Sequence, residues 1–220
     1  MRIVTVKRGP RPGTAVVTNP PEPPPLLPAD RGRVALLYHF TRLQLPAIRL
    51  PEPKFVTHLE RAFRLFLPKN PAPVPWAAFL EGLYAVDWAV CVGCLEGQNA
   101  AWEALFNART GRSDCLLVDA LRARAVRLYP RDDERQDTAV SEFWSNLLVP
   151  ESEGSLPVLA RYDGQRPLAP WLIRVFQNWH LSKLRAAGGV VALPDDDVAV
   201  PMDPVAVTDS AARWHEAFRQ

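Results

Sequence analysis

The chain has 220 residues, which is enough for one sizeable hydrophobic core and short for two. Hydrophobic residues make up 48% of it and charged residues 23%, proportions that exclude collagen-like, coiled-coil and wholly disordered proteins. No apolar run reaches the length of a membrane span, and the first residues lack the apolar core of a secretory signal. Three cysteines, an odd number, argue against a disulfide framework. Together these features predict a cytoplasmic protein.

The net charge of +2 conceals changes of sign along the chain. Residues 1–54 carry a formal charge of +6 and residues 161–185 carry +4, whereas residues 195–220 carry −4. Most charged runs in proteins are simply solvated surface. An asymmetry of this kind nevertheless favours a polyanionic partner for the basic segments.

Proline sets the first third of the chain apart, because 15 of the 23 prolines lie in residues 1–75. The run over residues 20–25 predicts an extended tether, since each proline ring fixes φ and removes a backbone donor. Residues 3–17 offer a short strand at best, and residues 33–45 form a short apolar-rich segment. Residues 55–67 have apolar residues at helical spacing and predict an amphipathic helix. We expect residues 1–75 to form a proline-rich basic extension with short elements.

From Pro75 onward the pattern changes to long helical periods. Asn99 is a candidate N-cap, the acids at residues 132–134 favour a helix start, and Gly188 with Gly189 favours a helix end. The expected helices cover residues 76–95 (as one helix or two), 100–108, 114–129, 132–149 and 168–187.

These patterns predict an all-α fold class with four segments. Residues 1–75 are the extension, and residues 76–188 are expected to form a compact helical domain. Residues 189–208 form an acidic, proline-spaced linker, and residues 209–220 begin one more helix.

Recognisable catalytic motifs are missing from the sequence. It carries no Gly-rich phosphate loop, HExxH or GxSxG motif, and its four histidines lack ligand spacing. Cys91 and Cys94 form a CxxC pattern, but Cys115 is the only other cysteine. A zinc site or a redox pair must be weighed here, and small buried core residues are the favoured interpretation. We expect neither enzymatic activity nor a cofactor.

One segment does indicate a partner. A polar loop with Tyr162 leads into the helix expected at residues 168–187. The polar residues expected on one face of this helix, away from the stripe of Leu168, Leu172 and Val175, are Arg174, Asn178, Lys183 and Arg185. Surfaces of this kind bind single-stranded nucleic acid, because cations follow the phosphates while aromatic faces stack on bases at about 1–3 kcal/mol each. A basic helix is, however, more often only a solvated helix.

The order of residues in this segment is more specific than its composition. The pattern W-L-x-x-[IV]-x-x-N-x-x-x-[DS]-x-L-R is filled by Trp171, Leu172, Val175, Asn178, Ser182, Leu184 and Arg185. The stretch resembles conserved region 2 of bacterial RNA polymerase sigma factors of the extracytoplasmic-function (ECF) group. Residues 86–94, 100–106 and 137–144 look like the other helices of that region, so the resemblance covers about residues 85–187. It implies a sigma-region-2-like helical bundle.

The resemblance also implies a function and a set of contacts. It implies a sigma factor that binds core RNA polymerase and recognises and melts the promoter −10 element. The helix at residues 132–149 would dock on the β′ clamp helices through Asp133, Asp137 and Ser141. Either Tyr162 or Arg166 would stack on a flipped base. The residues expected to contact the non-template strand are Arg161, Tyr162, Arg166, Arg174, Asn178, Lys183 and Arg185.

Four aromatic residues in these helices can be interpreted as core residues rather than as parts of the binding surfaces. Phe143 and Trp144 are expected to be core residues. Trp171 and Trp179 lie near the core stripe by helical spacing, so core packing is weighed against a role in the site.

Departures from the family pattern keep other functions open. Val140 stands where the family has glutamine, and Ser182 where aspartate is common. Residues 214–220 resemble only the first residues of region 4, the domain that reads the −35 element. One alternative is a sigma-derived interaction protein that binds polymerase or an anti-sigma factor without opening promoters. The other is a small metal-binding regulator built on Cys91, Cys94 and Cys115.

Overall fold

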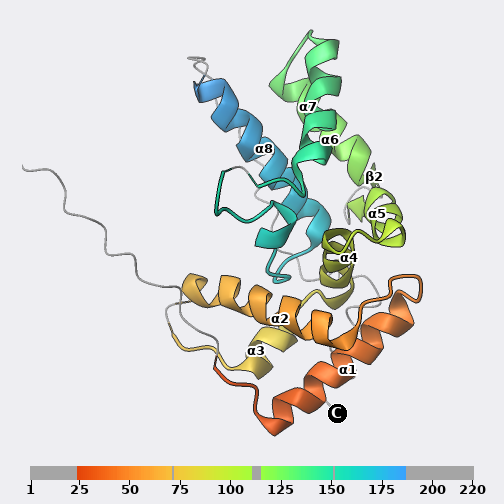
Figure 1. Ribbon diagram of the computed structural model, residues 1–220. Helices are drawn as coiled ribbons and strands as arrows, with labels where there is room; N and C mark the ends of the chain where they lie inside the picture. Colours follow the sequence, from red (N-terminus) through yellow and green to blue (C-terminus); the bar gives the residue numbers. More distant parts are fainter. Residues whose placement is uncertain (1–23, 71, 111–114, 151, 187–220) are drawn as a thin grey trace, which may run out of the picture.

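The computed structural model describes residues 24–70, 72–110, 115–150 and 152–186. Over these residues the fold is all-α, as expected (Figure 1). Two 3₁₀ turns, η1 (Leu67–Lys69) and η2 (Leu159–Arg161), and a two-residue antiparallel ladder of β1 (Arg109–Thr110) with β2 (Cys115–Leu116) complete the described elements. The α-helices are α1 (Pro28–Gln44), α2 (Glu52–Phe66), α3 (Trp76–Glu81), α4 (Ala85–Leu95), α5 (Asn99–Phe106), α6 (Leu117–Leu128), α7 (Asp133–Asn146) and α8 (Leu168–Ala186).

The helices form two layers around one core (Figure 1). Helices α1, α2 and α3 lie together in the first layer, and α4 connects it to the second layer of α5 to α8. Aromatic rings join the layers: Phe55 of α2 meets Trp88 of α4 edge-on, with ring centroids 4.9 Å apart. Residues 28–66 therefore share a core with the helices after residue 76 and are part of the folded body.

Helix α1 extends well beyond the short segment expected at residues 33–45. It buries Val34, Leu37, Tyr38 and Thr41, which follow the i, i+3, i+4, i+7 spacing of one helix face. Pro28 occupies the start of the helix, where its missing N–H has no intrahelical partner to lose. Proline at this position therefore begins the helix rather than interrupting it.

The helices of the second half follow the sequence expectations closely, with two corrections at their starts. Of the two alternatives for residues 76–95, one helix or two, the structure has two, α3 and α4. Helix α7 begins where the acidic cluster predicts, and the Asp132 side chain caps it by accepting the Arg135 N–H at 3.0 Å. Asn99 is not an N-cap, because α5 already includes it and Gln98 precedes the helix. Helix α6 starts at Leu117 since the two residues before it pair with β1.

Several expectations lie outside the described residues. They are the strand at residues 3–17, the first residues of the proline tether, the helix-ending glycines at 188–189, the acidic linker and the helix at residues 209–220. Among the described helices, none combines the length and apolar character needed to cross a membrane.

Candidate functional site

The outward face of α7 carries the three residues expected to bind polymerase. Asp133, Asp137 and Ser141 are all exposed and follow each other at intervals of four, so they lie on one side of the helix. We call these three residues the α7 face. The buried residues of α7 are Ala139, Val140 and Phe143, and Val140, which is 8% exposed, lies at the edge of the α7 face. At this position the sigma pattern has glutamine, and here an apolar side chain packs in the core.

The aromatic residues of α7 divide between core and surface. Phe143 is buried and meets Phe176 of α8 edge-on at 5.2 Å between ring centroids, as expected of a core residue. Trp144 is half-buried, and its ring contacts Phe106 of α5 at 4.8 Å. Phe143 thus connects α7 to α8, while Trp144 connects it to α5.

Helix α8 presents a polar stripe to solvent. Its exposed members are Arg174, Asn178, Ser182 and Arg185, which cluster on one side at 100° per residue. Trp171 lies at the start of the same side with its side chain only partly buried. We call these five residues the α8 stripe. It combines cations, an amide and an aromatic ring, the composition that suits an unpaired strand.

Lys183 does not belong to this stripe. It lies nine residues after Arg174, which is two and a half helical turns and therefore the opposite side of α8. Its Nζ donates to Glu142 Oε2 of α7 at 2.7 Å and lies 3.9 Å from the centre of the Trp179 ring. The expectation that Lys183 shares a face with Arg174 is wrong. Lys183 and Trp179 instead connect α8 to α7.

Tyr162 is a core residue, contrary to the expectation that its ring could stack on a base. Its side chain is 1% exposed, its ring packs against Trp171 at 5.0 Å, and its hydroxyl donates to the Arg166 carbonyl at 2.5 Å. Burial raises its pKa well above the usual value. Tyr162 therefore supports the loop from inside, and Trp171, which the sequence left ambiguous, is the aromatic ring on the stripe.

The two arginines of the loop differ in the exposure of their side chains. The Arg166 side chain is exposed, two residues before α8 begins. Arg161 is partly buried, and its Nε–H donates to the Leu156 carbonyl at 2.8 Å. Of the expected DNA contacts, Arg166, Arg174, Asn178 and Arg185 are thus exposed at the loop and along α8.

The cysteines of the CxxC pattern lie in the core. Cys91 and Cys94 are buried, and the Cys91 thiol donates to the Leu159 carbonyl at 3.3 Å. Burial raises both pKa values, that of Cys94 to about 12. Protonated thiols are poor nucleophiles and poor metal ligands. Within the described part of the chain, no group of three or more His, Cys, Asp or Glu side chains is arranged to hold a metal ion.

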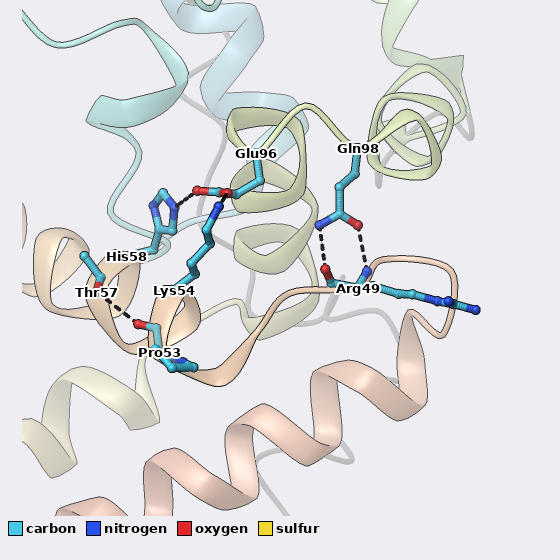
Figure 2. Close-up of polar contacts among 7 residues, drawn as sticks. All are labelled: Arg49, Pro53, Lys54, Thr57, His58, Glu96 and Gln98. Carbon is cyan, nitrogen blue, oxygen red and sulfur yellow. Dashed lines mark hydrogen bonds and ion pairs between the residues drawn. The ribbon is translucent and has the colours of Figure 1, made fainter.

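A polar cluster joins α2 to the end of α4 (Figure 2). Lys54 Nζ lies 2.5 Å from one oxygen of Glu96, and His58 Nε2 donates to the other at 2.8 Å. Next to them the Gln98 amide pairs with the Arg49 backbone, accepting its N–H at 2.7 Å and donating to its carbonyl at 3.0 Å. This pairing explains why the Gln98 side chain leaves α5 uncapped. We call Lys54, His58 and Glu96 the α2–α4 cluster.

Burial and the hydrogen bond to Glu96 act in opposite directions on the pKa of His58. Desolvation lowers the pKa of His58 more strongly than the hydrogen bond to Glu96 raises it. The same hydrogen bond, together with the one from Lys54, lowers the pKa of Glu96. The His58 Nδ1 atom is buried without a hydrogen-bond partner. The cluster is thus a polar link between α2 and the end of α4.

No family model, curated protein or solved structure matches the chain. The functional interpretation therefore depends on the two surfaces themselves. One is the acidic α7 face, and the other is the α8 stripe with Arg166 at its start.

Proposed function

We propose that the protein is a sigma-type initiation factor. It binds core RNA polymerase through the α7 face and the promoter −10 element through the α8 stripe and Arg166. It carries out no chemical reaction of its own and works in the cytoplasm, where the polymerase is. The observation that carries the proposal is the exposure of two surfaces of opposite charge at the positions where the sequence resembles region 2.

The composition of the α8 stripe supports binding to an unpaired strand. Arg174 and Arg185 can follow the phosphates, Asn178 can reach a base edge, and Trp171 offers a partly exposed ring. Arg166 adds a cation at the loop. Recognition of a melted strand depends on stacking and on phosphate contacts, and this surface provides groups for both.

The first test concerns the polymerase. We expect the full chain to co-elute with bacterial core RNA polymerase in gel filtration. Exchange of Asp133 and Asp137 for asparagine should weaken co-elution, since it removes two exposed charges and retains shape. The matched control is Asp119→Asn, which removes an exposed charge from α6. Failure of the folded wild-type chain to co-elute overturns the proposal.

The second test concerns DNA. Binding of a fork-junction −10 DNA should weaken with salt, with a log–log slope of about −2 for the contacts of Arg166, Arg174 and Arg185. The variant with both Arg174→Ala and Arg185→Ala should bind roughly tenfold less tightly and bring the slope to about −1. Lys183→Ala is the control, because its amine is paired with Glu142. A slope near zero for the wild type excludes this surface as the DNA site.

A second candidate is an interaction protein that binds polymerase or an anti-sigma factor without opening promoters. The burial of Tyr162 favours it, because the loop lacks the exposed tyrosine expected to hold a flipped base. Co-elution with polymerase but no binding of the fork-junction DNA would select this candidate.

A further inference from the structure

The loop of residues 162–167, which carries Arg166, packs into the junction of α3 and α4. Gly164 lies at its centre with φ of +75°, and a Cβ atom there would come within 2.4 Å of Leu83 and 3.1 Å of Trp88. The Tyr84 N–H donates to the Gly164 carbonyl at 2.8 Å. The backbone of the loop is therefore held by the first-layer side of the molecule at a distance that only glycine allows.

Side chains on both sides of Gly164 extend this attachment. Gln165 Nε2 donates to the Phe79 carbonyl of α3 at 3.0 Å. Asp163, whose side chain is 3% exposed, forms an ion pair with Lys69 of η1. One Asp163 oxygen also accepts the Gln165 N–H at 3.2 Å. The loop is thus tied to η1 and α3 through both side-chain and main-chain groups.

The start of α8 is tied to α4 by one carboxylate. Asp87 Oδ2 accepts the N–H of Leu168, the first residue of α8, at 2.8 Å. The first N–H groups of a helix have no partner within the helix, and a negative charge there also suits the helix dipole. Asp87 lies 81 residues earlier in the chain, so this cap sets the position of α8 relative to α4.

We propose that Asp87 and Lys69 are positioning residues for DNA binding. Through their bonds to the start of α8 and to Asp163, they hold Arg166 and the α8 stripe in the arrangement that binds a single strand. This inference rests on the proposed function and assigns a role in it to η1 and α4. A loop held in its binding conformation loses less entropy on association than a loop that the DNA must order.

The test compares two substitutions at one position. Asp87→Asn keeps an oxygen of the same shape for the Leu168 N–H, whereas Asp87→Ala removes it. With a labelled single-stranded DNA 20-mer of random sequence, we expect Asp87→Ala to bind about tenfold more weakly and Asp87→Asn to bind like the wild type. Lys69→Met removes the ammonium, retains an unbranched side chain, and serves as the second variant if Asp87→Ala does not fold. Lys54→Ala, which breaks an ion pair in the α2–α4 cluster, is the matched control.

A double-mutant cycle separates positioning from general loss of stability. If Asp87 acts by placing Arg166, the loss caused by Asp87→Ala should be clearly smaller when Arg166 is already alanine. Equal losses in both backgrounds overturn the positioning role. Hydrogen exchange without DNA should show faster exchange of the Leu168 amide in Asp87→Ala and unchanged exchange in α1.

The outcomes for this inference and for the proposed function differ. If Asp87→Ala binds the 20-mer like the wild type while Arg166→Ala binds more weakly, the inference fails and the proposed DNA site stands. If the wild-type chain does not bind the 20-mer, the proposed DNA site fails and the inference fails with it.

Discussion

Two polar junctions join the first-layer helices to the rest of the molecule, and they are built differently. The α2–α4 cluster lies near the surface and links side chains to each other (Figure 2). The attachment of the 162–167 loop is largely buried and uses main-chain groups of Phe79, Tyr84 and Leu168. Both connect segments far apart in the sequence, but only the second holds the loop that precedes α8.

The difference between the junctions indicates at which of them a substitution causes the smaller loss of stability. An exposed ion pair contributes little, because water and salt screen it and two flexible side chains must be ordered. A buried main-chain group that loses its partner costs about 1–3 kcal/mol, since no water replaces the lost bond. We therefore expect substitutions at the loop attachment to have larger effects than substitutions in the cluster.

The largest effect is expected for Gly164→Ala. The added methyl group meets Leu83 and Trp88 and the residue retains a positive φ, so we expect a loss of about 2–4 kcal/mol in the free energy of unfolding. Gly154→Ala is the control, because Gly154 has φ of +78° and open space around it, and should cost about 1 kcal/mol. Urea denaturation measures both. Equal losses would mean that the loop does not pack tightly against α4.

A smaller loss of stability is expected when the lysine of either junction is substituted, and the loss should differ between the two lysines. Lys69→Ala leaves the buried Asp163 carboxylate with one bond fewer, and should cost about 1–2 kcal/mol. Lys54→Ala should change stability by at most about 0.5 kcal/mol, because Lys54 is 60% exposed and Glu96 keeps its bond to His58. The comparison between the junctions breaks down if Lys54→Ala proves the more costly substitution in urea denaturation.

The smallest effect concerns pH and the α2–α4 cluster. The pKa of His58 is lower in the folded chain than its usual value near 6.5, so the unfolded chain binds the proton more readily. The contribution of the neutral form of His58 to the free energy of unfolding should therefore be fully present above about pH 6.5. It should decrease as the pH falls below that value. His180 is buried, its pKa is also lowered, and it acts in the same direction.

Variants at single histidines measure the contribution of His58. His58→Gln should flatten the decrease in stability between about pH 6.5 and 5 without abolishing it, since His180 remains. His39→Gln, at an exposed ring, is the control. A pH profile for His58→Gln identical to that of the wild type would show that the cluster does not respond to protonation.

Helices with strong periodicity were predictable from the sequence. The apolar spacing in α2, α7 and α8 and the acids at the start of α7 are local signals, and the structure confirms them. Helix α1 also had a local signal, because four buried residues follow one face and Pro28 can begin a helix. The proline-rich surroundings concealed it.

The candidate site likewise has features that follow from the local sequence and features that depend on tertiary packing. The exposure of the α7 face follows from helical spacing and the polarity of its residues, and the 180° separation of Lys183 from Arg174 follows from 100° per residue. Both depend only on the local chain. The sequence alone therefore determined the two helices and the outward side of each.

Only the tertiary structure decided how the loop of residues 162–167 is held in place. The cap that Asp87 provides for α8 and the ion pair of Lys69 with Asp163 join residues many positions apart, and the burial of Tyr162 depends on the same packing. Such contacts depend on how α3, α4 and α8 pack, and no local spacing encodes that packing. A buried polar group must find its partner wherever the fold brings one, because in the core it has lost its hydrogen bonds to water and nothing else replaces them.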